Sequence, residues 1–396
     1  MPISIACRGH RAVRALVTTV ALLLTACGGG GGGGGPSAPV SVSLLTASSA
    51  LADVCTLDGE KRFARSYIDE VYLWRDQVPG VDATAFASLS AYFDALMVRT
   101  PDANGLPTDR FSAVISTASA DSLLSGGAAP VATALSAPTT SVPLVATVSS
   151  PGARQVGYIL FDRHARGAQD ALITAFEALK SQAVADLVLD LRNNPGGYLY
   201  VAQALASMVA GPQHAGAVFE TLRYSPQRTA AGAGQTLRFS DRVSTAETRY
   251  PLDHPLPQLD LPRVYVLASG LTCSASESVV NSLRGIGVQV VLVGGATCGK
   301  PYGFHRKDNC GKAYFAIEFQ GFNALGEGGY SAGFAPQCAV DEDPGAALGS
   351  PSEPLLAAAL HHIDTGSCPA ATRAAQLRSR RVPDAQSQLL GRLLHY

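Results

Sequence analysis

The stretch Leu271-Thr272-Cys273-Ser274-Ala275-Ser276-Glu277 follows an apolar run predicted to be a buried strand, and it opens a predicted helix. A second stretch, Thr297-Cys298-Gly299-Lys300, comes shortly after the next apolar run. The sequence thus places a serine at the start of a helix and a lysine just past the following strand. A serine hydroxyl attacks only when a base takes its proton, and a lysine with a lowered pKa can be that base. If the two side chains meet, the pattern predicts a serine hydrolase with a Ser-Lys pair.

The start of the predicted helix favours nucleophilic chemistry at Ser274. Free backbone N–H groups there can donate to a developing oxyanion, and the helix dipole favours negative charge. We expect the Ala275 N–H to be one such donor. Lys300 lies at the end of a strand, on the edge of an α/β sheet where ligands bind. Taken alone, Ser274 could be only a helix cap and Lys300 only a surface lysine; the combination favours catalysis.

A third motif, Asp190-Leu191-Arg192-Asn193-Asn194-Pro195-Gly196-Gly197, lies between a predicted buried strand and a helix. Gly196 and Gly197 permit a tight turn whose N–H groups can point into a cleft. We expect one of them to supply the second half of an oxyanion hole. Asp190 and Arg192 are expected to form a structural ion pair.

Strands and helices alternate through most of the second half of the chain, which predicts right-handed crossovers and a parallel or mixed sheet. The expected strands are 156–161, 187–191, 264–268 and 288–293, and the expected helices are 169–182, 199–209, 274–283 and 354–363. Residues 302–304 and 313–319 resemble a hairpin with Asp308-Asn309 at its turn. Nearer the N-terminus, 62–73 and 83–98 have helical periodicity, and Trp74 between them is expected to be a core anchor.

The N-terminus has the features of an export signal. Basic residues precede an apolar run at 15–24 that is too short to span a bilayer in the mature protein. The run ends in Leu24-Thr25-Ala26-Cys27, which resembles the bacterial lipobox, so Cys27 is the expected lipidation site. The alternative is an ordinary signal peptide cleaved near Ala26. By resemblance to bacterial lipoproteins, the absence of aspartate after Cys27 favours the outer membrane over the inner one.

Composition limits the class of partner and the state of the cysteines. Charged residues make up 15% of the 396 residues and the formal net charge is −1, so no basic surface for nucleic acid is expected. Of eight cysteines, Cys7 leaves with the signal and Cys27 would carry lipid. The other six allow 15 disulfide pairings, and we favour a bridge within Cys298, Cys310 and Cys338. No spacing typical of a zinc site is present, so no metal is expected.

Together the motifs D-L-R-N-N-P-G-G, T-C-S-A-S-E and T-C-G-K, in this order, resemble the carboxyl-terminal processing (tail-specific) serine peptidases. The resemblance covers about Val156 to Pro344 and the segment around Trp74. It implies an α/β fold with a ClpP/crotonase-like core and a small helical N-terminal subdomain. It also implies Ser274 as nucleophile, Lys300 as general base, and cleavage of exported polypeptides near their C-termini without metal or nucleotide. The oxyanion donors carried over are Ala275 and one of Gly196 and Gly197.

The chain departs from that family at several positions. A PDZ domain usually precedes the core, whereas here a low-complexity stretch at 116–151 occupies its place, with one strand expected around 142–148. Phe304 and Gly285 stand about where the family has a glutamine and an aspartate, and Cys273 replaces an alanine. We interpret Cys273 as a small buried residue or half of a disulfide, and not as a rival nucleophile.

The expected organisation follows from these assignments. It comprises a signal peptide with lipobox at 1–27, a Gly/Pro/Ser-rich tether at 28–50, a helical subdomain at 51–115, a linker at 116–151, a peptidase core at 152–367 and a tail at 368–396.

Two other functions remain open. Without a PDZ domain the chain could be a weak or inactive scaffold that binds peptides or another ligand on the same fold. The third alternative is an esterase or amidase with a Ser-His triad, but no Gly-x-Ser-x-Gly surrounds Ser274. His164 is the histidine considered for it, although a surface or capping role is expected there.

Overall fold

The computed structural model describes residues 45–124 and 140–370. The predicted signal peptide with Cys27, most of the tether and most of the tail lie outside these residues. No helix among the described residues is both long and apolar enough to cross a membrane.

The core is built on a six-stranded sheet in the order β13-β8-β7-β4-β3-β2. Its strands are β2 (Leu144–Ser149), β3 (Gln155–Leu160), β4 (Asp186–Asp190), β7 (Arg263–Ala268), β8 (Gln289–Gly294) and β13 (Cys338–Ala339). All neighbours are parallel except β2, which runs antiparallel to β3 along one edge. The inner strands are continuously apolar because both faces of the sheet are covered.

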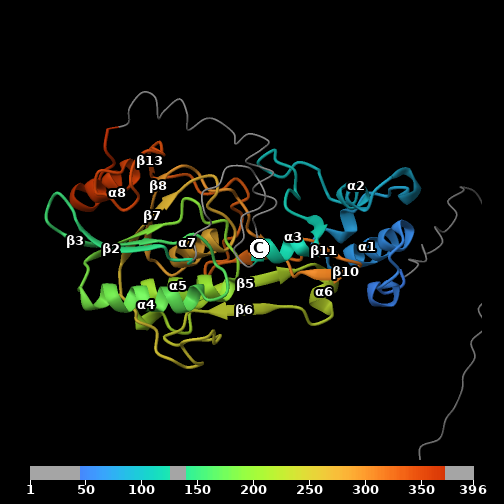
Figure 1. The fold of residues 1–396 in the computed structure, drawn as a ribbon, viewed down its shortest axis with the longest axis horizontal. Helices are drawn as coiled ribbons and strands as arrows, with labels where there is room; N and C mark the ends of the chain where they lie inside the picture. Colours follow the sequence, from blue (N-terminus) through green and yellow to red (C-terminus); the bar gives the residue numbers. More distant parts are fainter. Residues whose placement is uncertain (1–44, 125–139, 371–396) are drawn as a thin grey trace, which may run out of the picture. The chain divides into compact units, whose positions relative to one another are not determined.

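Helices cover the two faces of this sheet unequally. The helices α4 (Ala168–Ser181), α5 (Leu199–Val209) and α7 (Ala275–Gly285) pack on one face, and α8 (Pro354–Thr365) packs on the other (Figure 1). Successive residues of β7 point to opposite faces of the sheet. Val264 and Val266 face the three helices, whereas Tyr265 and Leu267 face α8. The predicted fold class, a mixed α/β core with a helical N-terminal region, is confirmed.

Two smaller sheets extend from the core. One has the order β6-β5-β12-β9, from β5 (Val218–Tyr224), β6 (Gln235–Arg238), β9 (Tyr302–Gly303) and β12 (Phe319–Phe322). The other has the order β1-β11-β10, from β1 (Ala113–Ser116), β10 (Lys307–Asn309) and β11 (Lys312–Phe315). The predicted late hairpin is therefore wrong in its pairing. The turn falls at Cys310-Gly311, both with positive φ, and β9 pairs with β12 in the other sheet.

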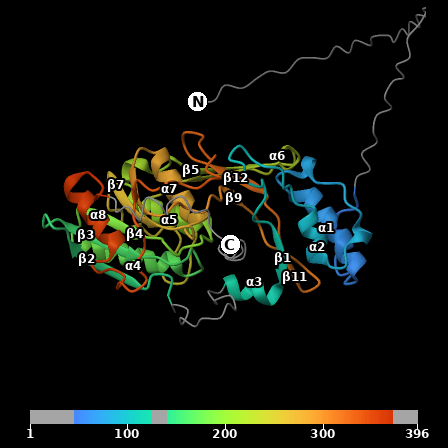
Figure 2. The ribbon, with the colours of Figure 1, turned by 90° about the horizontal axis from the view of Figure 1, so that it is seen from above.

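The helical N-terminal region packs against the late strands (Figure 2). It contains α1 (Leu57–Val71) and α2 (Leu89–Ala95), with 3₁₀ turns at Ser48–Leu51, Arg75–Gln77 and Ala83–Ala85. The second helix is shorter than predicted, because Ser88 is extended and caps its start by accepting from the Ala91 N–H. Trp74 is only half-buried, edge-on between Tyr72 and Tyr302.

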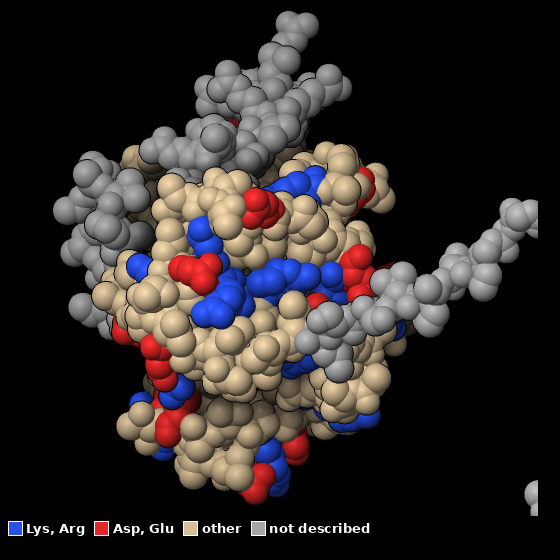
Figure 3. All heavy atoms as spheres, turned by 90° about the vertical axis from the view of Figure 1, so that its right-hand side faces the viewer, with Lys and Arg blue, Asp and Glu red and all other residues tan. Residues whose placement is uncertain are grey.

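Several shorter elements were not predicted. They include α3 (Thr117–Leu124) in the expected linker, the 3₁₀ turn Pro212–His214, α6 (Pro226–Ala230) and the strands β1, β5, β6, β12 and β13. The strand expected around 142–148 is present as β2. Where Figure 3 shows the surface, a short band of Lys and Arg side chains is bordered by Asp and Glu side chains. This mixture agrees with the near-neutral net charge.

All six cysteines among the described residues are paired. The disulfides join Cys55 to Cys310, Cys273 to Cys298, and Cys338 to Cys368. The bridge predicted within Cys298, Cys310 and Cys338 is wrong, because each of these residues bonds to a cysteine outside that set. The alternative interpretation of Cys273 as half of a disulfide is confirmed.

Candidate active site

Ser274 occupies a strained turn between β7 and α7. Its φ is 53° and its ψ −117°, an uncommon conformation for a residue with a side chain. Gly196 lies directly against this turn: a Cβ there would be 2.7 Å from the Cys273 carbonyl oxygen and 2.8 Å from the Ala275 nitrogen. Glycine at 196 is therefore a steric requirement for bringing the two motifs together. Ser274 itself remains partly exposed, so a substrate can reach it.

Lys300 is buried after β8, with 2% of its surface exposed. Its Nζ lies 4.4 Å from the centre of the Phe304 ring and 5.3 Å from that of Phe111. Burial lowers the pKa of Lys300 to about 7, although the charges of Asp109 and Glu277 act in the opposite direction. A substantial fraction of this amine is therefore neutral near pH 7 and able to accept a proton.

Ser274 and Lys300 line the same cavity, whose volume is about 900 Å³. Gly197 and the start of α5 form one part of its wall, and β5, β6, β9 and β12 form another. The three sequence motifs, from distant parts of the chain, thus meet at one cavity. Phe304, which stands where the family resemblance implied a glutamine, also lines it and presents a ring to the lysine.

The buried carboxylate of Glu277 links the turn of Ser274 to the loop of Lys300. One oxygen accepts from the Ser274 N–H at 3.0 Å and the Lys300 N–H at 2.8 Å. The other accepts from the Gly299 N–H at 2.9 Å and the Thr297 hydroxyl at 2.6 Å. Burial raises the pKa of Glu277, and these hydrogen bonds partly oppose that rise. Four donors on one carboxylate fix the two backbone segments relative to each other.

A disulfide links the same two segments. Cys273 directly precedes Ser274, and Cys298 lies two residues before Lys300. The Cys298 N–H also donates to the Thr272 carbonyl oxygen at 3.0 Å. The segments that carry Ser274 and Lys300 are therefore joined by a covalent bond, a backbone hydrogen bond and the Glu277 carboxylate.

The candidate oxyanion donors lie next to Ser274. Ala275 begins α7, where the first N–H groups have no partner within the helix. The Gly196 N–H already donates to Asn194 Oδ1 at 3.0 Å. Of the two glycines, Gly197 is therefore the better candidate for the second donor. It also lines the cavity, in a left-handed conformation with φ of 138°.

The expected ion pair of Asp190 and Arg192 is present and lies in the core. The Arg192 guanidinium also binds both oxygens of Glu353 at the start of α8, at 2.8 and 2.9 Å. This buried triad fixes the strand end from which the Gly196-Gly197 turn departs.

The surface or capping role expected for His164 is wrong. Its side chain is 1% exposed and its Nδ1 lies 3.1 Å from Asn194 Oδ1. Burial lowers the pKa of His164 to about 3, against the effect of the hydrogen bond with Asn194. Since it does not line the cavity, it supports the second motif and offers nothing to a Ser-His triad.

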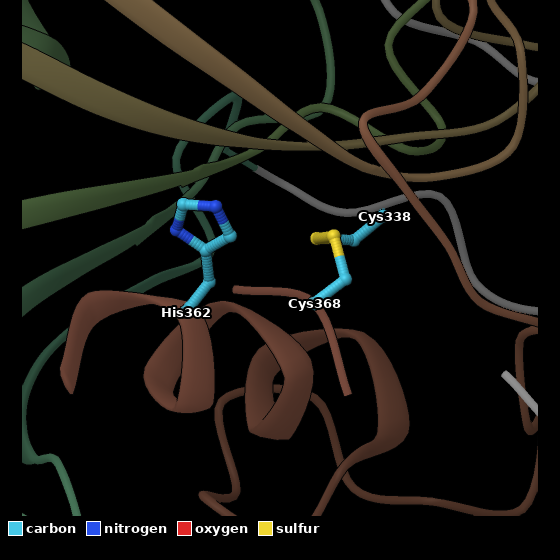
Figure 4. A group of neighbouring side chains, drawn as sticks. All are labelled: Cys338, His362 and Cys368. Carbon is cyan, nitrogen blue, oxygen red and sulfur yellow. A yellow bond between two sulfur atoms is a disulfide. The ribbon is translucent and has the colours of Figure 1, made fainter. Parts of the chain in front are cut away.

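Two groups of side chains have the residue types of a metal site. One is Cys338, His362 and Cys368, shown in Figure 4, and the other contains Cys273, Glu277 and Cys298. In both groups the two cysteines are joined in a disulfide and so provide no thiolate ligands.

Sequence reasoning missed the roles of Glu277 and Asp109. Glu277 is the third helical residue after Ser274, and the pattern Ser-x-x-Glu before an apolar run indicates a capping box. That signal could have identified the carboxylate as a partner of the Ser274 backbone. Asp109 is buried in the N-terminal region, where it accepts from the Tyr72 hydroxyl at 2.7 Å. No local pattern indicates that its charge acts on Lys300.

Two family models match this sequence. The model of peptidase family S41 matches residues 155–309, and the model of the peptidase S41 N-terminal domain matches residues 59–113. Together they cover just over half of the chain. The chain belongs to peptidase family S41. The helical N-terminal region belongs to the same family, since the second model matches it.

Individual relatives agree with this assignment. A carboxyl-terminal-processing protease of Picosynechococcus sp. is 29% identical over 158 residues, which are 40% of this chain and 32% of the relative. The match thus spans about a third of the length of that curated relative. The solved structure of a proposed S41 protease from Bacteroides fragilis aligns with a TM-score of 0.60 and 21% identity, covering 77% of this chain and 97% of that one. This second likeness concerns the fold.

We predict that replacing both Cys273 and Cys298 with alanine lowers the free energy of unfolding by about 3 kcal/mol, since the bond closes a span of 25 residues. Turnover of the folded fraction should also fall, because the segments of Ser274 and Lys300 lose their covalent link. Urea denaturation and peptide hydrolysis without reductant measure the two effects.

The matched control replaces Cys55 and Cys310, neither of which lines the cavity. This variant should lose stability but keep the turnover of its folded fraction. The same loss of turnover in both double variants would contradict a local role for the Cys273–Cys298 bond.

Proposed function

We propose that this protein is a serine endopeptidase in which Ser274 is the nucleophile and Lys300 is the general base. The observation that carries the proposal is the buried Lys300 amine, with a pKa lowered to about 7, in the cavity that Ser274 also lines. The buried Glu277 carboxylate, which binds the backbone N–H of both residues, supports it further. A scaffold that only binds peptides needs neither feature.

The proposed reaction follows from these positions. Neutral Lys300 takes the proton of the Ser274 hydroxyl as its oxygen attacks the substrate carbonyl carbon. The Ala275 and Gly197 N–H groups stabilise the resulting oxyanion, and loss of one such donor typically costs about 10²–10³ in turnover. The protonated lysine then gives its proton to the leaving amine, which departs as an acyl-enzyme forms. Water, with Lys300 again as base, hydrolyses the acyl-enzyme and restores Ser274.

We further propose that the substrates are exported polypeptides cut near their C-termini by an enzyme anchored through lipid on Cys27. The relative from Picosynechococcus, described as a carboxyl-terminal-processing protease, supports the type of cleavage. The lipobox-like Leu24-Thr25-Ala26-Cys27 supports the anchor, with the periplasmic side of the outer membrane as its place. No metal or cofactor enters the proposed mechanism.

Ser274→Ala and Lys300→Ala should each abolish peptide hydrolysis without unfolding the protein. Alanine at 274 keeps the backbone bond to Glu277, and alanine at 300 removes a buried amine that is costly to bury. Hydrolysis is measured with a mixture of unstructured peptides, and folding by circular dichroism. Thr236→Val, on β6 in the wall of the same cavity, serves as a control for nonspecific damage. Hydrolysis retained by folded Ser274→Ala protein would exclude the mechanism.

The rate should rise with pH through about 7. Lys300 acts only when neutral, and its pKa of about 7 makes the neutral fraction grow roughly tenfold per pH unit below that value and level off above it. The measurement is kcat/KM for one peptide from pH 5 to 9. A rate that keeps rising tenfold per pH unit up to pH 9 would mean that Lys300 has the pKa of an ordinary exposed lysine.

Cys27→Ser should release the protein from the membrane. The substitution removes the only thiol that the lipobox-like motif offers to a lipid. Fractionation of cells that produce either form, followed by immunoblotting, measures the change, and Cys7→Ser is the control. An unchanged membrane fraction for Cys27→Ser would contradict the anchor.

A further inference from the structure

A buried carboxyl group outside the proposed mechanism lies in the wall of the same cavity. Glu220 lies on β5, whose residues otherwise place apolar side chains such as Phe219 and Leu222 in the interior. Its side chain is 2% exposed, and it is the only carboxylate among the described residues that line the cavity. A buried acid of this kind requires a partner or a function.

One oxygen of the Glu220 carboxyl group accepts a hydrogen bond, and the other has no hydrogen-bond partner among the described residues. The Ser278 hydroxyl donates to Oε1 at 3.1 Å. No donor among the described residues lies within hydrogen-bond distance of Oε2. Burial raises the pKa of Glu220 to about 7, and the hydrogen bond from Ser278 opposes that rise. Tyr330 is the titratable neighbour, and the charge of Glu220 helps burial to raise its pKa. A cation bound to Oε2 would favour the ionised carboxylate.

The neighbouring strand is shaped to hold this carboxyl group. Gly321 on β12 pairs with Leu222 on β5, next to Glu220 in the sheet. A Cβ at Gly321 would lie 1.9 Å from Glu220 Oε1 and 2.4 Å from its carboxyl carbon. The acid therefore occupies the space above a glycine, and any larger residue would displace it.

The position of Glu220 relative to Ser274 indicates what it can contact. Ser278 is four residues after Ser274 on α7, so it lies on the same face, about 6 Å farther along the helix. Glu220 is therefore about one helical turn below the nucleophile. Leu222 and Phe319 also line the cavity, so a side chain that reaches Glu220 can pack an aliphatic stem beside them.

We propose that Glu220 makes this peptidase selective for lysine or arginine in the substrate residue whose carbonyl Ser274 attacks. That side chain begins within two bonds of the attacked carbon, so it is the one that enters the space beside Ser274. Only a long side chain reaches Oε2, and only one that ends in a donor satisfies it. The inference rests on the proposed serine peptidase function and adds the class of its substrates.

The experiment uses the full-length protein and internally quenched peptides that differ at one position, occupied by lysine, arginine, norleucine or glutamate. Mass spectrometry identifies the bond that is cut. The measured quantity is the ratio of kcat/KM for the lysine peptide to that for the norleucine peptide. A ratio well above one is expected for the wild type, with cleavage after the varied residue.

Two variants test the assignment of this preference to Glu220. Glu220→Gln keeps the shape but removes the charge, and should lower the ratio roughly ten- to hundredfold, as expected for loss of a charged hydrogen bond. Gly321→Ala displaces the same carboxyl group without changing it and should lower the ratio in the same direction, even if Glu220→Gln folds poorly. Glu177→Gln, on the exposed side of α4, should leave the ratio unchanged.

The possible failures are distinct. A wild-type enzyme that cuts peptides in a manner dependent on Ser274, but with equal rates for lysine and norleucine, would overturn the inference and leave the proposed function intact. A lysine preference that persists in both variants, or that lies only on the amine side of the bond, would also overturn it. Absence of any cleavage by the wild type would overturn the proposed function and the inference with it.

Discussion

The hydrogen bonds of the Glu277 carboxylate are the constraint on which the site depends. Ser274 and Lys300 come from segments on either side of β8, and each could adopt many positions as part of a free loop. A single buried carboxylate accepts from the backbone of both and from two further donors in the lysine segment. Because the Glu277 side chain is fully buried, these bonds fix the geometry before a substrate arrives. The strained φ of Ser274 persists because its surroundings determine it from several sides.

The proposed base and the proposed nucleophile need opposite environments. A base amine must lose its hydration to become neutral, whereas the nucleophile must remain open to a polypeptide. Lys300 is enclosed by the rings of Phe111 and Phe304, one of which comes from the N-terminal region. Ser274 directly precedes α7 and lines the cavity. The helical N-terminal region is therefore part of the environment of the base. For this reason the charge of Asp109, which lies in that region, raises the pKa of Lys300.

Local patterns predicted the elements that depend on local interactions. The helix expected at 199–209 is α5 with the same bounds, and the inner strands were found within about a residue, because a buried parallel strand is continuously apolar. Strand β5 was missed because its stability comes from pairing with β12, about a hundred residues away, and β6 is an edge strand that pairs with β5. The acid in the middle of β5 also interrupts its apolar pattern.

The motifs named Ser274, Lys300 and Gly197, which line one cavity, but the sequence could not assign the carboxylates around them. The disulfide pairing was beyond sequence reasoning for the same reason: it depends on which loops meet in space. The turn at Cys310-Gly311 was assigned to Asp308-Asn309 because those residue types prefer turns, whereas the neighbouring disulfide to Cys55 and the strand register decide its place.

The order in which the cysteines leave the ribosome gives the Cys55–Cys310 bond a particular consequence. Two of the disulfides join cysteines that are consecutive among the described residues, but the first cysteine must bypass two others before its partner is synthesised. Oxidation in order of emergence would join Cys55 to Cys273 and take away the partner of Cys298. Maturation of this chain therefore requires either a delay in oxidation until the strands have assembled or a later exchange of bonds between thiols.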